Sequence, residues 1–369
     1  MNILILSDLI AYSGVGQYMV QLGETIALNK ENTVVMASSC IIRTDISENI
    51  ITIKLSNPRK VFRYLKQLHS IIKARNIQVV HVNHRMTAFM MRLYQLIYGK
   101  IATVWTCHTV PYPNNIIKRL LGYYGHKTIA ISEEAKVWMR EELHIDESRV
   151  DKVINGVDNT SLVIPQIDKS KLKEEFFEKR FNEKIDGLNT KIIVAHGRLD
   201  PVKGLDLLIK AFSKLDEDYK KNLSIVFSGD VNTPYCQKLI TLISQLGVSK
   251  YVKFVGWIAS AEILSIADLM VQPSHREGFP LAVLEAFFMK VPVIRTKTGG
   301  YRDMQHCCIG VPIGDMDAVH KELISWLGKP DCYSQMVEDA FRFANNECTV
   351  QTMTNKTIEV YKSAIKICQ

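Results

Sequence analysis

The chain has 369 residues, a hydrophobic content of 47% and a charged content of 23%. These values are ordinary for a globular protein, and the length exceeds what one compact core usually supports, so we expect two domains. No stretch of about 18 uncharged apolar residues occurs, so we expect no helix that spans a membrane.

The net charge of +8 is unevenly distributed along the chain. Residues 1–128 hold 15 basic and 5 acidic residues, and no acid occurs between Asn49 and Ser132. Such an asymmetry is typical of a surface that meets an anionic partner. We expect no nucleic acid to be this partner, because the cations are mixed with apolar runs and no nucleic-acid module is recognisable.

The first residues and the cysteines indicate a cytoplasmic protein. Residues 1–8 lack a basic leader and a small-residue cleavage site, which predicts the first strand of a sheet and no signal peptide. The eight cysteines are scattered and form no Cys-x-x-Cys pair. We therefore expect free thiols in a reducing compartment and no metal site.

In the first half of the chain, apolar runs alternate with helical patterns, which predicts a parallel sheet with helical crossovers. The expected strands are 3–7, 33–36, 50–54, 79–82, 102–106 and 127–131, and the expected helices are 16–27, 59–74, 87–98 and 133–142. The turn residues at 155–158 predict the crossing to a second domain. A charged, helix-prone insert at 168–184 is expected to be peripheral and mostly solvated.

The second half repeats the alternation of strands and helices. The expected strands are 191–196, 223–228, 252–254, 269–271 and 291–295, and the expected helices are 202–214, 233–246, 259–266, 281–289, 315–327, 330–346 and 349–367. Two successive series of this kind predict an α/β protein with two lobes.

Two loops of the second half have the composition of a phosphate site. Arg198 and Lys203 flank a turn directly after strand 191–196, and ligands of open α/β sheets bind at this end of a strand. Together they can neutralise a diphosphate, although Gly-Arg after a strand is also common as plain surface charge. The second loop, 273–280, enters a helix whose first backbone N–H groups attract phosphate.

Two glutamates accompany the second loop. Glu285 lies among apolar residues of the helix, and a buried carboxylate needs hydrogen-bond donors, which two ribose hydroxyls would supply. Glu277, at the loop tip, could accept hydrogen bonds from the hydroxyls of a bound sugar.

With these motifs, the chain resembles the retaining GT-B glycosyltransferases of family 4, of the bacterial surface-polysaccharide type. The matching pieces are Gly197-Arg198 with Lys203-Gly204, Glu277 with Glu285, Pro292-Val293-Ile294 with Gly299-Gly300, Ser13-Gly14-Val15-Gly16 and Asn155-Gly156-Val157-Asp158. The resemblance implies two Rossmann-like, doubly wound domains. An acceptor-binding domain would span 1–160, with the helix 349–369 packing back on it, and a donor-binding domain would span 161–348.

The resemblance also implies the roles of individual residues. The expected catalytic residues are Arg198, Lys203, Glu277 and His108, and the expected donor-binding residues are Gly14, Gly16, Gly197, Gly278, Phe279, Pro280, Leu281 and Glu285. His108 lies at the end of a strand. It either acts near the reacting sugar carbon, as the resemblance implies, or only makes a structural hydrogen bond. The glycines at 14 and 16 either approach the donor diphosphate or only permit a tight turn.

Three further histidines have open assignments. His81 and His84 follow the end of another strand-like run, where they could face the acceptor, but a structural role is the stronger expectation. His196, inside a strand run, is expected to be packed in the core.

The implied reaction moves a hexosyl or N-acetylhexosaminyl group from a nucleoside-diphosphate sugar, with UDP favoured, to a hydroxyl of a glycan. The acceptor is expected to be lipid-linked, in the synthesis of a surface polysaccharide such as lipopolysaccharide. Alternatives are a soluble small-molecule or protein acceptor, a nucleotide-sugar epimerase, and a non-catalytic partner subunit.

No metal cofactor is expected. Asp315-Met316-Asp317 resembles the metal-binding pair of other sugar transferases, but it precedes a helix, where an aspartate serves as N-cap. We expect Arg198, Lys203 and the amides of 278–281 to replace the metal.

Two segments predict binding to an anionic membrane. Residues 57–75 form an amphipathic pattern with six cations, and residues 115–124 mix cations with apolar residues. The alternative for the first segment is a helix that packs its apolar face on the sheet. With a lipid-linked acceptor, these patterns predict a cytoplasmic protein attached peripherally to the inner face of the cell membrane.

Overall fold

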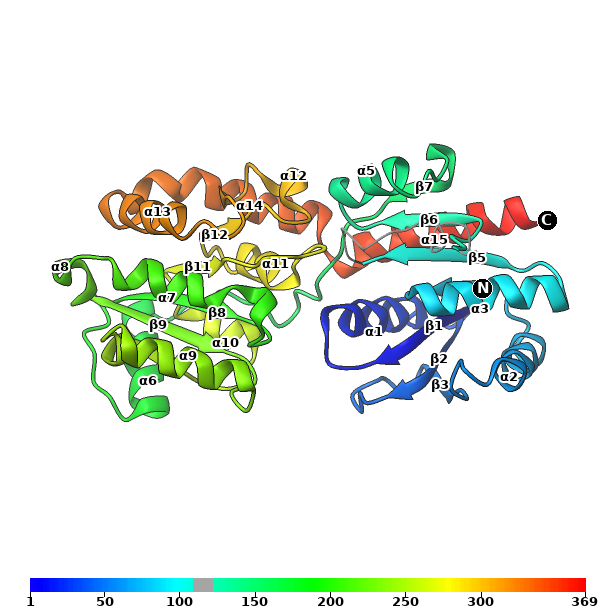
Figure 1. The fold of residues 1–369 in the computed structure, drawn as a ribbon, viewed down its shortest axis with the longest axis horizontal. Coiled ribbons are helices and arrows are strands. Elements are labelled where there is room, and N and C mark those ends of the chain that lie inside the picture. Colours follow the sequence, from blue (N-terminus) through cyan, green and yellow to red (C-terminus); the bar gives the residue numbers. More distant parts are fainter. Residues whose placement is uncertain (109–121) are drawn as a thin grey trace. The chain divides into compact units, whose positions relative to one another are not determined.

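The computed structural model describes residues 1–108 and 122–369 and divides into two compact units (Figure 1). The first unit comprises Met1–Val157 with Glu347–Gln369, and the second comprises Asp158–Asn346. The sequence predicts these boundaries at residues 160 and 349. Most of the expected membrane patch at 115–124, including Lys118 and Arg119, lies outside the described residues.

A seven-stranded parallel sheet forms the centre of the first unit, in the order β3-β2-β1-β4-β5-β6-β7. The chain therefore winds outward from β1 in one direction, returns, and winds in the other. The strands are β1 (Asn2–Ile10), β2 (Thr33–Ile41), β3 (Ile51–Lys54), β4 (Val79–Val82), β5 (Ala102–Cys107), β6 (Lys127–Ala130) and β7 (Val150–Lys152). Every residue of β4, β5 and β6 is buried, as expected where helices cover both faces.

Helices cover both faces of this sheet. α1 (Gly14–Ala27) and α15 (Val350–Cys368) pack on one face, and α2 (Val61–Ala74), α3 (Arg85–Tyr98) and α5 (Glu133–Glu141) pack on the other. Although α15 ends the chain, it contacts β4, β5 and β6 as well as α1. Its Tyr361 hydroxyl lies 2.7 Å from Nδ1 of His81 on β4, so the last helix completes the core of the first unit.

The amphipathic helix expected at 59–74 is α2, and its apolar face packs on the sheet. The buried residues of this face are Tyr64, Leu65, Leu68, Ile71 and Ile72. The cations of α2 remain exposed, since burial favours the apolar side chains while charged ends stay in water. Among the described residues, no helix has the length and apolar character needed to cross a bilayer.

A six-stranded parallel sheet forms the centre of the second unit, in the order β10-β9-β8-β11-β12-β13. The strands are β8 (Lys191–His196), β9 (Leu223–Ser228), β10 (Val252–Phe254), β11 (Leu269–Gln272), β12 (Val293–Thr296) and β13 (Ile309–Val311). The winding direction reverses between the neighbours β8 and β11. The loops that follow these two strands therefore diverge, which is where ligands of such sheets bind.

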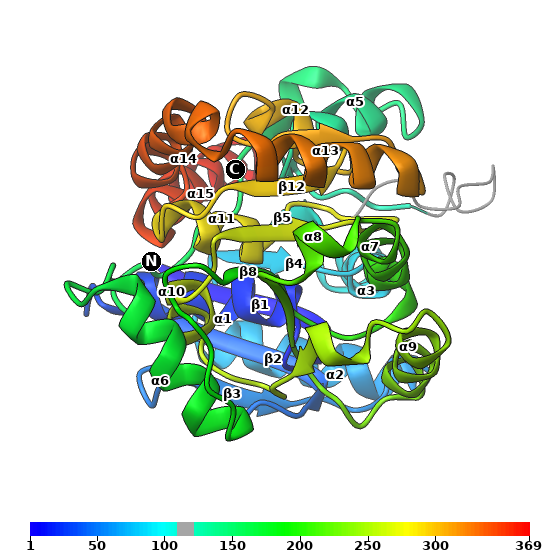
Figure 2. The same cartoon turned by 90° about the vertical axis from the view of Figure 1, so that its left-hand side faces the viewer.

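The helices of the second unit also lie on both faces of its sheet. They are α6 (Lys169–Phe181), α7 (Leu205–Ser213), α8 (Glu217–Lys220), α9 (Pro234–Gln245), α10 (Ser260–Ser265), α11 (Leu281–Phe288), α12 (Tyr301–Met304), α13 (Met316–Gly328) and α14 (Ser334–Glu347). Figure 2 shows α7 and α9 on one side of the strands and α10 on the other. The expectation of two doubly wound α/β sheets is confirmed.

Four of the short elements are not predicted from the sequence. β7 and β13 have three residues each, and α8 and α12 have four. Such segments are too short to show a clear period of two or of 3.6. β10 also has three residues, but the sequence predicts it at its observed bounds, 252–254.

The insert expected at 168–184 contains α6 and is mostly exposed, as expected, but one face of α6 is buried. Phe176 and Phe177 are buried, and the Lys173 side chain is only 4% exposed. Lys173 Nζ lies 2.7 Å from Oδ2 of Asp268, which also accepts a hydrogen bond from the backbone N–H of Ile192. α6 thereby ties together the amino ends of β8 and β11.

We predict that Lys173→Ala lowers the free energy of unfolding by about 2 kcal/mol, because Asp268 loses the nearer of its two ammonium partners and keeps only Lys169 at 3.5 Å, and the Thr190 carbonyl loses a donor. Lys171→Ala, on the exposed side of the same helix, serves as the control and should change this energy by less than about 0.5 kcal/mol. Urea denaturation of both variants measures the difference. Equal midpoints would show that the ion pair does not stabilise the fold.

Candidate functional site

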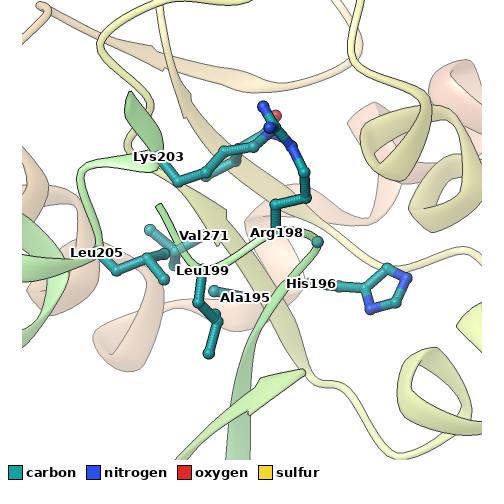
Figure 3. A pocket seen from close by; sticks show the side chains of 9 residues that line it. Ala195, His196, Arg198, Leu199, Lys203, Leu205 and Val271 are labelled. Atoms are coloured by element: carbon teal, nitrogen blue, oxygen red, sulfur yellow. The ribbon is translucent and has the colours of Figure 1, made fainter. Parts of the chain in front are cut away.

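The predicted site residues of the second unit gather at the carboxyl ends of β8 and β11. A pocket there is lined by residues 195–199 from β8 and its loop, by Lys203 and Leu205, and by Val271 and Gln272 at the end of β11. In Figure 3, the side chains of Arg198 and Lys203 reach the same place above the strands, and His196 points away from them. The parallel sheet thus brings the loop with Arg198 and Lys203 next to the end of β11.

Close backbone contacts hold the loops of this site together. The N–H of His275 donates to the carbonyl of Val202 at 2.8 Å. Gly204 has φ 62°, and a Cβ at this position would overlap the carbonyl oxygen of Pro273. Gly299 lies against the same loop, where a Cβ would come within 2.5 Å of two carbonyl oxygens. The glycines at these places are therefore required by contact between loops.

Both cations of the site have carboxylate partners. Arg198 is 59% exposed and lies 3.0 Å from Asp200, and Lys203 Nζ lies 2.8 Å from Glu277 Oε1. The hydroxyl of Ser274 donates to the same Glu277 oxygen at 2.6 Å. An incoming diphosphate must therefore compete with Asp200 for the guanidinium and with Glu277 for the ammonium.

The N-terminus of α11 offers backbone donors to an anion. Its N-cap is Pro280, which makes no side-chain capping bond, whereas Ser13, Thr233 and Asp315 cap other helices with their side chains. No side chain of the N-cap therefore uses the first N–H groups of α11, although the Val283 N–H donates to the Pro280 carbonyl at 3.2 Å.

The residues that precede α11 differ in their surroundings. Phe279 is 4% exposed and lies against Gly300, and Pro280 is buried, whereas Gly278 and Leu281 are partly exposed. Gly278 and Leu281 are therefore the more accessible residues of this segment.

Glu285 projects from α11 into a desolvated, polar setting. Its side chain is 21% exposed, burial raises the pKa of its carboxyl, and a hydrogen bond from the Ser260 hydroxyl acts in the opposite direction. His196 Nε2 lies 3.9 Å from the carboxylate. His196 is buried as expected, but it lies beside this carboxylate and is more than core packing. Ser260 was not predicted, because a serine at a helix start ordinarily indicates a cap.

His81, His84 and His108 of the first unit lie at or near the carboxyl ends of β4 and β5. His108 Nε2 lies 2.8 Å from Oδ1 of Asn83, and burial, reinforced by His84 and His81, holds the pKa of His108 well below its usual range. His81 is fully buried and lies 2.6 Å from Thr106, which is the structural role we expected. His84 is the N-cap of α3 and contacts Ser7.

The two predicted glycines of the first unit serve different purposes. A Cβ on Gly16 would overlap the carbonyl oxygen of Ala11, so the tight turn after β1 requires this glycine. No atom lies within 4 Å of the corresponding point on Gly14, which leaves its backbone open to a ligand. Ser13 caps α1 by accepting a hydrogen bond from the Gly16 N–H at 3.2 Å.

Both carboxylates of the Asp-x-Asp segment have partners within the protein. Asp315 is the N-cap of α13 and accepts a hydrogen bond from the Ala318 N–H at 2.8 Å, as predicted. Asp317 lies 2.8 Å from Lys214 Nζ. Within the described parts of the chain, no three His, Cys, Asp or Glu side chains form a group that could hold a metal.

Comparison with known proteins assigns the fold and the general activity. Residues 176–343 match the family described as glycosyl transferases group 1, and residues 12–161 match Glycosyltransferase Family 4. The fold is similar to that of Anabaena HepE, solved in complex with UDP, with a TM-score of 0.84 at 17% identity over 98% of this chain and 100% of that one. The chain is a glycosyltransferase of the GT-B type.

Two curated relatives of this glycosyltransferase extend over more than half of the chain. N-acetyl-alpha-D-glucosaminyl L-malate synthase of Bacillus anthracis is 25% identical over 77% of this chain and 76% of its own length. UDP-Gal:alpha-D-GlcNAc-diphosphoundecaprenol alpha-1,3-galactosyltransferase of Escherichia coli is 26% identical over 65% of this chain and 63% of its own length. The two names describe different acceptors.

We predict that Gly204→Ala destabilises this glycosyltransferase more than Gly247→Ala. Both glycines have positive φ, 62° and 69°, so each substitution adds a similar backbone strain of about 1 kcal/mol. Only at Gly204 would the new methyl group meet the loop after β11, since no atom lies within 4 Å at Gly247. Urea denaturation compares the two variants. Equal losses would contradict a forced contact between the two loops.

Proposed function

We propose that the protein transfers a hexosyl or N-acetylhexosaminyl group from a UDP-sugar to a hydroxyl of a glycan, with retention of the anomeric configuration. The observation that carries this proposal is the convergence of Arg198 and Lys203 at the carboxyl edge of the second sheet, where Lys203 pairs with Glu277 of the loop that leads into α11. The two cations suit a diphosphate, and Glu285, 3.9 Å from His196 of the same strand end, suits the hydroxyls of a ribose.

Two of the similar proteins support uridine as the base. HepE was solved with UDP, and the name of the Escherichia coli relative gives a UDP-sugar as its donor. A donor-hydrolysis assay with UDP- and GDP-sugars tests this choice, together with a thermal-shift screen, because a ligand that binds only the folded state raises the melting temperature. Activity with GDP-sugars alone would exclude UDP as the natural carrier.

In the proposed reaction, negative charge builds up on the departing diphosphate. Arg198 and Lys203 would leave their carboxylate partners and stabilise this charge, with the first amides of α11 as additional donors. Glu277, released from Lys203, would then accept hydrogen bonds from the transferred sugar. The acceptor hydroxyl attacks from the side of the leaving group, whose phosphate takes the proton. We also propose a catalytic role for His108 at the end of β5.

We propose that this transfer needs no metal ion. Two protein cations and a helix N-terminus supply the positive charge, and the carboxylates of Asp315 and Asp317 are occupied by a helix cap and by Lys214. The acceptor is proposed to be lipid-linked, as the name of the Escherichia coli relative describes for that enzyme. A soluble acceptor is the alternative, since the Bacillus anthracis relative is named for L-malate.

We predict that Arg198→Ala and Lys203→Ala each lower kcat by about 10² to 10³, the effect of one lost transition-state donor. Lys238→Ala, on the exposed side of α9, is the matched control and should retain full activity. Transfer rates with and without a chelator complete the experiment. Loss of transfer on chelation, with recovery on addition of Mg²⁺ or Mn²⁺, would overturn the metal-independent mechanism.

We also propose that the first unit binds the inner face of a bacterial cell membrane through the outer surface of α2 and α3. These helices contact each other and expose Phe62 (85%), Leu96 (77%) and Ile97 (57%). Arg63 and Lys66 lie exposed on α2 beside Phe62. Exposed apolar side chains next to cations are the combination that an anionic bilayer attracts.

We predict that the protein floats with anionic vesicles and not with neutral ones. Combining Phe62→Ser, Arg63→Glu and Lys66→Glu should abolish flotation, since each cation contributes about 1 kcal/mol near an acidic leaflet. Lys171→Glu combined with Lys238→Glu, both exposed in the second unit, changes the net charge by the same amount and serves as the control. Equal recovery with both lipids, or an equal loss in the control, would exclude this surface and favour a soluble acceptor.

A further inference from the structure

A second pocket lies at the amino edge of the second sheet, where its strands begin. It has a volume of about 330 Å³ and is lined by Lys191, the first residue of β8, and by Asp268 and Pro292, which directly precede β11 and β12. α6, α13 and α14 supply further lining residues. β8 has six residues, so at about 3.3 Å per residue the amino and carboxyl edges lie about 20 Å apart. The pocket is therefore separate from the proposed donor site.

Positive charge exceeds negative charge around Asp268 in this pocket. The ammonium groups of Lys169 and Lys173 share the Asp268 carboxylate, at 3.5 and 2.7 Å. Partial burial lowers the pKa of Lys169; Asp268 opposes this effect, and Lys173 and Lys191 reinforce it. Lys191 itself has no ion-pair partner among the residues that the structure describes. Three ammonium groups thus accompany one carboxylate, a surplus of two positive charges.

Other lining residues combine a balanced ion pair with apolar surfaces. Lys290 Nζ lies 2.6 Å from Oε1 of Glu338, so these two groups add no net charge. Pro292 and the rings of Trp326 and Tyr333 also line the pocket. Trp326 is buried, whereas Tyr333 is partly exposed and can contact a ligand. A ligand of this pocket therefore meets both uncompensated cations and an aromatic ring.

We propose that this pocket binds an organic phosphate, a phosphate monoester with a planar apolar group, at the same time as the donor occupies the carboxyl edge. A phosphate monoester carries a charge of about −1.5 to −2 at pH 7, which matches the surplus around Asp268. Lysine ammonium groups bind phosphate, and the anion also relieves their mutual repulsion, which a neutral ligand would leave in place. Small-molecule pockets have volumes of about 300 to 1,000 Å³, so the space is sufficient for such a ligand.

Calorimetric titration of phenyl phosphate into the full-length protein tests the inference. UDP is kept at saturation, so that the nucleotide engages Arg198 and Lys203 under the proposed function. Lys191→Gln should weaken the binding of phenyl phosphate about 10-fold, as expected for one lost hydrogen bond to a charged group. Lys238→Gln, on the exposed side of α9, removes the same charge elsewhere and should leave the affinity unchanged. Lys191→Arg keeps the charge and should retain the affinity within about 3-fold.

Two tyrosine variants test the organic part of the ligand. Tyr333→Ala should weaken the binding of phenyl phosphate about 5-fold, the effect of one lost aromatic contact, and should leave the affinity for inorganic phosphate within about 2-fold. Tyr219→Ala, on α8, removes another exposed tyrosine and should change neither affinity.

Several results would overturn the inference. Absence of phenyl phosphate binding at millimolar concentration would do so, and so would equal affinities of Lys191→Gln and Lys238→Gln. Loss of binding in Arg198→Ala, with retention in Lys191→Gln, would show that the phosphate binds at the donor site instead. Equal effects of Tyr333→Ala on both phosphates would exclude an organic ligand. Melting temperatures show whether each variant is folded, and Lys169→Gln, also expected to bind about 10-fold more weakly, provides a second test of the cations.

Discussion

The hydrogen bond from the His275 N–H to the Val202 carbonyl is the contact on which the site of the second unit depends. Lys203 follows Val202 directly, and Glu277 stands two residues after His275, so a backbone contact brings this ion pair within reach. Gly204 permits the contact, because any larger residue would collide with the loop after β11. The geometry of the site is therefore set by the main chain, and its side chains need only adopt suitable rotamers.

Because the main chain sets the geometry of the site, the parts of the site next to regular strands could be predicted from the sequence. Runs of apolar residues identified β8 and β11, and a ligand site lies at the carboxyl ends of adjacent strands where the winding direction reverses. Arg198 and Lys203 follow from their place after such a strand, and Glu285 follows from its place among apolar residues of the next helix. The cap at Asp315 was predictable as well, because a cap involves residues only three positions apart.

Pairings between distant residues were not predictable, because no local pattern encodes them. Lys203 binds Glu277, and His196 reaches Ser260, through contacts that exist only once the sheet and its loops have formed. The faces of α2 show a related ambiguity. An amphipathic helix has the same period whether its apolar side meets a bilayer or a sheet, and here a neighbouring sheet was available to bury it.

The packing of α15 on the first sheet has a consequence for the order in which the protein folds during synthesis. The second unit is one continuous segment, Asp158–Asn346, whereas the first is interrupted and needs Val350–Cys368 for its core. Buried side chains on β4 and β5 therefore lack their cover until the last helix has left the ribosome. During synthesis, the second unit therefore has all of its residues before the first unit does. Until α15 is made, one face of the first sheet stays uncovered.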